Sequence, residues 1–143
     1  MSGSTFRDLT KGIEKILESG ATVILLEAGK HAGEEFAKTL LSKGMKKEEL
    51  PAALETFFTQ SGWGKIHTDV DFAKQKVVIR IKNSATARQT KAKEPVCHFI
   101  RGYIAGTLHA IFHINTDCIE TQCLAKGDPF CEFQVRNDLA KLV

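Results

Sequence analysis

Long apolar runs are missing from this 143-residue chain, and so is a strong excess of charge of one sign. The longest apolar stretch, residues 21–26, is far shorter than the ~20 residues that a membrane-spanning helix needs. Residues 1–10 lack the apolar centre of a signal peptide. The net charge of +3 comes from interleaved basic and acidic residues, which argues against a nucleic-acid-binding surface. These absences predict a cytoplasmic protein without a membrane span.

Cysteine is absent from the first 96 residues, and all four cysteines lie between Cys97 and Cys131. The same stretch contains Glu120 and three of the five histidines. Thiolates that bind one metal ion must converge on it, so clustered cysteines are typical of a metal site. In a reducing compartment such a cluster indicates metal ligands or free thiols rather than disulfides.

The periodicity of the apolar residues predicts four helices and four strands. Helical spacing covers residues 6–19, 21–44, 46–60 and 96–113, and strand-like patterns cover 65–72, 76–82, 114–125 and 130–136. This order predicts a single α+β domain over residues 1–143, with helices packed on a four-stranded antiparallel sheet. Glycine pairs at i and i+4, Gly29 with Gly33 and Gly102 with Gly106, predict close helix packing.

Spacing alone supplies three ligands for a metal and leaves the fourth open. Cys123 and Cys131 flank a turn centred on Gly127, and Cys97 stands where the last helix begins. Either Cys118 or Glu120 can complete a tetrahedron, provided that a bulge or twist aligns the strand. The further alternatives are a histidine ligand (His98, His109 or His113), four buried free cysteines, or a Cys123–Cys131 disulfide. A site with three cysteines and a glutamate is closed, which predicts a structural zinc ion.

Three segments of the last 45 or so residues resemble the 4-vinyl reductase (vinyl-4-reductase) domain family. They are Cys97-x-Phe99-x-x-Gly102-x-x-x-Gly106, Glu120-x-x-Cys123, and Lys126-Gly127-Asp128-x-x-Cys131-x-Phe133. The resemblance implies a fold similar to that of TRAPP vesicle-tethering subunits and haem-based nitric-oxide-binding domains. It also implies a homodimer in which Cys97, Glu120, Cys123 and Cys131 hold zinc and Cys118 is a bystander.

Family members that sense phenols and other aromatics bind the effector in a hydrophobic pocket between helices and sheet. Here the resemblance suggests a lining of Phe58, Trp63, His67, Phe99 and Tyr103, with Trp63 and His67 as polar groups. We therefore expect a small-molecule-binding or sensor domain for a hydrophobic or aromatic ligand. Because no ATPase or DNA-binding domain is evident, a separate regulatory partner protein is expected to read the bound state.

Two other functions stay open at this stage. An assembly subunit with an acyl-type pocket would share the fold. A reductase acting on a vinyl group of a tetrapyrrole would need a hydride source, and the sequence shows neither a dinucleotide fingerprint nor a flavin site. It also shows no convincing catalytic acid–base pair. We therefore expect the protein not to be an enzyme.

Overall fold

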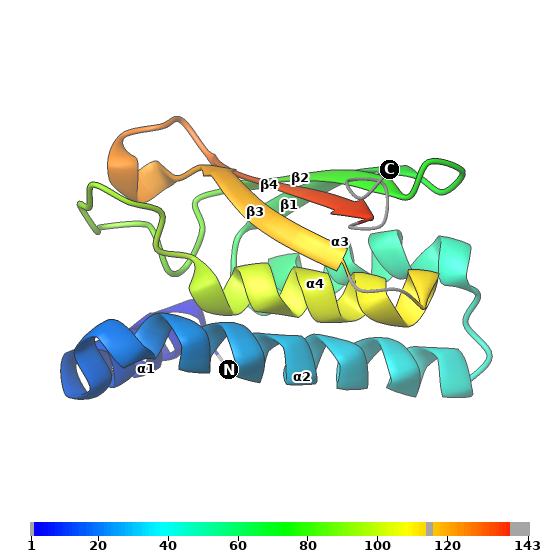
Figure 1. Ribbon diagram of the computed structural model, residues 1–143, viewed down its shortest axis with the longest axis horizontal. Helices are drawn as coiled ribbons and strands as arrows, with labels where there is room; N and C mark the ends of the chain where they lie inside the picture. The colour runs from blue at the N-terminus through cyan, green and yellow to red at the C-terminus, as the bar shows by residue number, and fades with distance from the viewer. Residues whose placement is uncertain (1, 114–115, 138–143) are drawn as a thin grey trace.

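The computed structural model describes residues 2–113 and 116–137, whose helices gather on one face of a single sheet (Figure 1). The helices are α1 (Gly3–Leu17), α2 (Ala21–Ser42), α3 (Leu50–Gln60) and α4 (His98–Phe112). The strands are β1 (Lys65–Asp71), β2 (Lys76–Lys82), β3 (Thr116–Gln122) and β4 (Cys131–Asn137). Among the described residues, no helix combines the length and apolar character needed to cross a membrane. The predicted α+β class is confirmed.

Local sequence signals account for the helix boundaries. The hydroxyl of Ser2 accepts a hydrogen bond from the Thr5 N–H at 3.2 Å and caps the start of α1. A carboxylate oxygen of Glu49 accepts from the Lys46 N–H at 2.9 Å in the turn before α3, whose first turn contains Pro51. Residues 21–26, which could have formed a buried strand, are the beginning of α2.

The sheet has the strand order β1-β2-β4-β3, and every neighbouring pair is antiparallel. The predicted four-stranded antiparallel sheet is therefore confirmed. Side chains alternate between the two faces, so Ile66, Ile79 and Ile81 are buried against the helices whereas His67 and Arg80 are exposed. The strands β1 and β3 form the two edges.

The glycine pairs let α2 and α4 pack with their backbones in contact. A methyl group on Gly33 would overlap the Tyr103 carbonyl, and one on Gly106 would overlap the Lys30 carbonyl. The hydroxyl of Thr107 also donates to the Gly33 carbonyl at 3.3 Å. Figure 1 shows α4 lying between α2 and the sheet. The predicted close packing is confirmed, and it places the start of α4 at a fixed height under the sheet.

The third strand is shorter than predicted. Its expected span of 114–125 includes residues 114 and 115, which lie outside the described residues, and the strand ends at Gln122. Leu124–Lys126 form a 3-10 turn instead, closed by hydrogen bonds from the Lys126 and Asp128 N–H groups to the Cys123 carbonyl. This turn removes Cys123 from the regular ladder and sets its direction independently of the strand.

Candidate functional site

Cys97 stands at the N-terminal cap of α4, where backbone N–H groups have no partner within the helix. Its own N–H donates to Oε1 of Glu120 at 3.0 Å. Its sulfur accepts a hydrogen bond from the Thr86 hydroxyl at 3.0 Å and lies 3.4 Å from the Ser84 hydroxyl. The sulfur is fully buried. These contacts fix the Cys97 side chain and stabilise negative charge on it.

A β-bulge brings the remaining groups of the cluster together. The register of β3 against β4 pairs Glu120 with Phe133 and Gln122 with Glu132, so Thr121 is the extra residue. The Thr121 hydroxyl donates to the Glu132 carboxylate at 2.7 Å and secures the bulge. The structure therefore contains the irregularity that the odd spacing of Glu120 and Cys123 requires.

The ligand atoms of Cys97, Glu120, Cys123 and Cys131 all lie within 4.8 Å of one another, and all four residues are buried. The sulfurs of Cys97 and Cys131 are 3.8 Å apart. A tetrahedron with zinc–sulfur bonds of about 2.3 Å has an edge of about 3.8 Å. The other carboxylate oxygen of Glu120 is buried without a hydrogen-bond partner, as expected for an atom that faces a cation. The donor set and its dimensions fit a tetrahedral zinc ion.

Crowding shifts the pKa values of these four acids in opposite directions. Burial raises the pKa of Glu120 to about 8, and the charge on Cys123 adds to the effect. Hydrogen bonds from Cys131 and Cys97 lower the pKa of Cys123 to about 2, whereas the bond to Cys123 raises that of Cys131 to about 12. The cluster thus favours one thiolate on its own, and a metal cation at its centre would favour deprotonation of the others.

The other candidate ligands lie outside the cluster. Cys118 is buried on β3 opposite Val135, and all four cysteines are free thiols rather than disulfides. His98 lines a small pocket of about 290 Å³ with Arg101 and Glu120 but is not one of the converging groups. His109 approaches Glu34 at 4.0 Å, and His113 ends α4 at the surface. Within residues 2–113 and 116–137, Glu120 is therefore the side chain that completes the set.

A second constellation is a cluster of seven aromatic rings between the helices. Its members are Phe6, Phe36, Phe57, Phe58, Trp63, Phe99 and Tyr103, with neighbouring ring centroids 4.5 to 6.3 Å apart. The indole N–H of Trp63 is buried without an acceptor. Burial also raises the pKa of the Tyr103 hydroxyl. A buried donor among apolar rings is an energetically costly feature that an added acceptor would relieve.

Four of the five predicted pocket residues belong to this aromatic cluster. The fifth, His67, is exposed on the outer face of β1, where it lines a separate pocket of about 400 Å³ with Arg80 and Phe130. The structure therefore does not place His67 with the other four residues. Sequence reasoning missed Phe6, Phe36 and Phe57 as members of the cluster. The helical spacing that marks Phe6 and Phe36 as core residues does not reveal that both reach the same rings.

Comparison with known proteins gives this arrangement a context. The model of the 4-vinyl reductase domain family matches residues 77–137. One uncharacterized protein of Methanocaldococcus jannaschii is 29% identical over 133 residues, covering 90% of this chain and 66% of the relative. Another from the same organism is 30% identical over 129 residues, covering 86% of this chain and 71% of the relative. The chain spans slightly less than two thirds of the first relatives that it matches, 66%, 60% and 65%.

Solved structures share the fold. The phenol-responsive sensory domain of the transcription activator PoxR, solved with phenol, matches with a TM-score of 0.75 and 22% identity, covering 96% of this chain and 75% of that one. A vinyl-4-reductase family protein from M. jannaschii matches with a TM-score of 0.58 and 26% identity, covering 78% and 66%.

More distant matches also bear out the predicted fold. A trafficking protein particle complex subunit 3 from Naegleria fowleri, covalently bound to palmitic acid, has a TM-score of 0.69 at 16% identity, covering 94% of this chain and 91% of that one. An H-NOX protein from S. oneidensis has a TM-score of 0.62 at 10% identity, covering 95% and 76%. Together with the family match and the M. jannaschii relatives, these comparisons show that the chain belongs to the 4-vinyl reductase domain family.

Proposed function

We propose that this chain is a binding or sensor domain for a small aromatic molecule, stabilised by a structural zinc ion. The observation that carries the proposal is the indole N–H of Trp63, buried among aromatic rings without an acceptor. A ligand with an aromatic body and a hydroxyl or carbonyl oxygen would stack on the rings and accept this hydrogen bond. The PoxR domain, which shares the fold, is described as phenol-responsive, which supports a ligand of this class.

In this proposal Phe58, Trp63, Phe99 and Tyr103 line the ligand site. Phe6 of α1 lies 4.5 Å from Trp63 and covers one side of it. Space for a ligand therefore requires the aromatic cluster to rearrange, and a shift of Phe6 with α1 is the smallest such change. His67 remains a candidate from the sequence, but its exposed position on β1 separates it from the other four side chains.

Zinc would be held by Cys97, Glu120, Cys123 and Cys131. Four protein ligands leave no open coordination position, so the ion would supply structural cross-linking and charge neutralisation rather than activate a substrate. It would join the start of α4 to the ends of β3 and β4. This arrangement favours binding over catalysis, and the reductase reading lacks a residue set that would hold a hydride donor. We place the domain in the cytoplasm, where thiols stay reduced.

We further propose a homodimer, with α1 and the start of α2 as the contact surface. Five apolar side chains are exposed there: Leu9, Ile16, Leu17, Val23 and Ile24. Ile16 is 80% exposed and Val23 is 64% exposed. A second copy burying the same face would cover them in a self-complementary way. A conformational change of α1 on ligand binding would then reach the dimer contact, where a regulatory partner protein can detect it.

Tryptophan fluorescence tests the ligand proposal directly, because Trp63 is the only tryptophan in the chain. Titrating the purified protein with phenol should change the Trp63 emission in a saturable way. The variant Trp63→Phe keeps the ring but removes the N–H, and calorimetry should show phenol binding weakened by about five- to tenfold. Phe112→Leu, an aromatic change outside the cluster, is the matched control and should leave the affinity unchanged. Absence of saturable binding in the wild-type protein would refute the aromatic-ligand proposal.

A further inference from the structure

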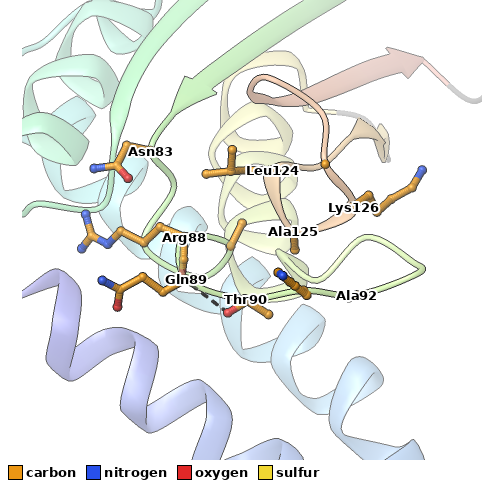
Figure 2. A pocket seen from close by; sticks show the side chains of 11 residues that line it. Asn83, Arg88, Gln89, Thr90, Ala92, Leu124, Ala125 and Lys126 are labelled. Carbon is orange, nitrogen blue, oxygen red and sulfur yellow. Dashed lines mark hydrogen bonds between the residues drawn. The ribbon is translucent and has the colours of Figure 1, made fainter.

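A cleft of about 840 Å³ lies on the side of the molecule where the loop of residues 83–92 faces the connection between β3 and β4. Figure 2 shows Asn83, Arg88 and Gln89 on one side of it and Leu124, Ala125 and Lys126 on the other. Its volume is within the range of small-molecule sites. The cleft shares no lining residue with the seven-ring aromatic cluster or with the cysteine–glutamate cluster.

The charges around this cleft all have one sign. Arg88, Lys91 and Lys126 line it, and none of its lining residues is acidic. Over the part of the chain that the structure describes, none of the three cations forms a salt bridge. Arg88 is oriented by a hydrogen bond from Nη2 to the Gly62 carbonyl at 3.2 Å, whereas the two lysines are exposed and can turn toward a ligand. An unpaired cationic rim attracts anions.

The interior of the cleft is apolar and well fixed. Ala87, Ala92, Leu124 and Ala125 supply small apolar surfaces beneath the cationic rim. The Ala92 N–H donates to the Ala125 carbonyl at 2.9 Å and joins the two walls. Both walls also reach the metal ligands, because Thr86 contacts the Cys97 sulfur and the Leu124 N–H contacts the Cys131 sulfur at 3.4 Å. A preformed apolar floor with charges at its edge suits a ligand of mixed character.

We infer that this cleft binds a small organic anion, an apolar or aromatic body that carries one phosphate or carboxylate group. The anionic group would lie between Lys91 and Lys126, and the body would rest on the alanine and leucine surface. This site is independent of the proposed aromatic ligand at Trp63, which would be neutral and enclosed by rings.

Isothermal titration calorimetry with phenyl phosphate tests the inference on the full chain. The double variant Lys91→Gln, Lys126→Gln removes both charges but keeps most of each side chain. Its Kd for phenyl phosphate should be at least about tenfold higher than that of the wild-type protein. The matched control Lys43→Gln, Lys47→Gln changes the net charge equally at exposed lysines outside the cleft, and its Kd should not change. Binding should also weaken as salt is added.

Two comparisons separate this site from its alternatives. Trp63→Phe should leave phenyl phosphate binding unchanged while it weakens phenol binding, so the two proposals can fail separately. Inorganic phosphate should bind much more weakly than phenyl phosphate, because it makes no use of the apolar floor. The inference is overturned if the wild-type protein does not bind phenyl phosphate at millimolar concentration, if both lysine variants bind it equally, or if inorganic phosphate binds as tightly.

Discussion

Replacing Cys131 by serine should release the proposed metal ion and destabilise the fold. The serine oxygen is not ionised at neutral pH, and its shorter bond to Cβ withdraws it from a centre that the Cys97 and Cys131 sulfurs approach at a mutual distance of 3.8 Å. Structural zinc binding is worth about 10–16 kcal/mol at pH 7 in small domains. An even division among four ligands assigns about 2.5–4 kcal/mol to each one, which corresponds to zinc binding weakened by about 10²–10³-fold.

The same free energy should appear in the stability of the protein, because zinc binds the folded chain far better than the unfolded one. For a chain of 143 residues, a loss of about 2.5–4 kcal/mol corresponds to a fall in Tm of about 10 °C. The zinc content of the purified variant is measured by mass spectrometry of the metal, and its Tm by calorimetry.

Cys118→Ser is the matched control for this experiment. Cys118 is also a buried thiol on the same stretch of chain, so its replacement buries a hydroxyl in the same way without touching the proposed metal. We expect this control to keep one zinc ion per chain. The assignment of the ligands is wrong if Cys131→Ser retains full zinc content and the wild-type Tm, or if Cys118→Ser loses zinc to the same extent.

Three other substitutions test the packing, the bulge and the dimer. Gly33→Val should lower the free energy of unfolding by at least about 2–3 kcal/mol in urea denaturation, because its side chain would collide with the α4 backbone. Glu132→Gln should cost about 1–2 kcal/mol at pH 7. The Thr121 hydrogen bond and Arg80 lower the pKa of Glu132, so this difference should shrink as the pH falls below about 4.5, where the unfolded chain takes up the proton. Ile16→Asp should convert a dimer into a monomer in light scattering while the Tm of the monomer stays unchanged; an unchanged mass would contradict the proposed contact surface.

The sequence was sufficient to predict the elements whose signals are local. The spacing of Gly29 with Gly33, and of Gly102 with Gly106, predicted a close helix pair because two small residues one turn apart have few other uses in a helix. The period-two alternation of residues 65–72 and 76–82 likewise predicted β1 and β2 to within one residue. In both cases the pattern itself has the period of the structure.

The sequence could not place residues whose position depends on irregular backbone or on distant segments. Cys118 and Glu120 are two residues apart on one strand, and only the bulge at Thr121 and the 3-10 turn after Cys123 decide which of them meets the other cysteines. His67 was grouped with Trp63 by proximity in the chain, but the alternation of β1 directs it to the outer face. The contribution of Phe6 to the aromatic cluster depends on how α1 packs, which no local signal reports.

A short chain of contacts connects the proposed metal centre with the proposed ligand site. The Ala85 N–H donates to the Trp63 carbonyl at 2.8 Å, and the neighbouring residues Ser84 and Thr86 both contact the Cys97 sulfur. Trp63 is therefore held by the same loop that supports a metal ligand. If zinc orders this loop, zinc must strengthen phenol binding, and by linkage phenol must strengthen zinc binding by the same factor.

The size of this coupling can be measured through Thr86, whose hydroxyl is the shorter of the two contacts to the Cys97 sulfur. In the wild-type protein, saturating phenol should tighten the equilibrium binding of zinc, measured by competition with a chelator, by about fivefold or more. Thr86→Val preserves the shape of the side chain but removes the hydroxyl, and it should reduce that factor toward one. A factor that is one in the wild-type protein, or unchanged in Thr86→Val, would show that the two sites act independently and that the loop of residues 84–86 transmits nothing between them.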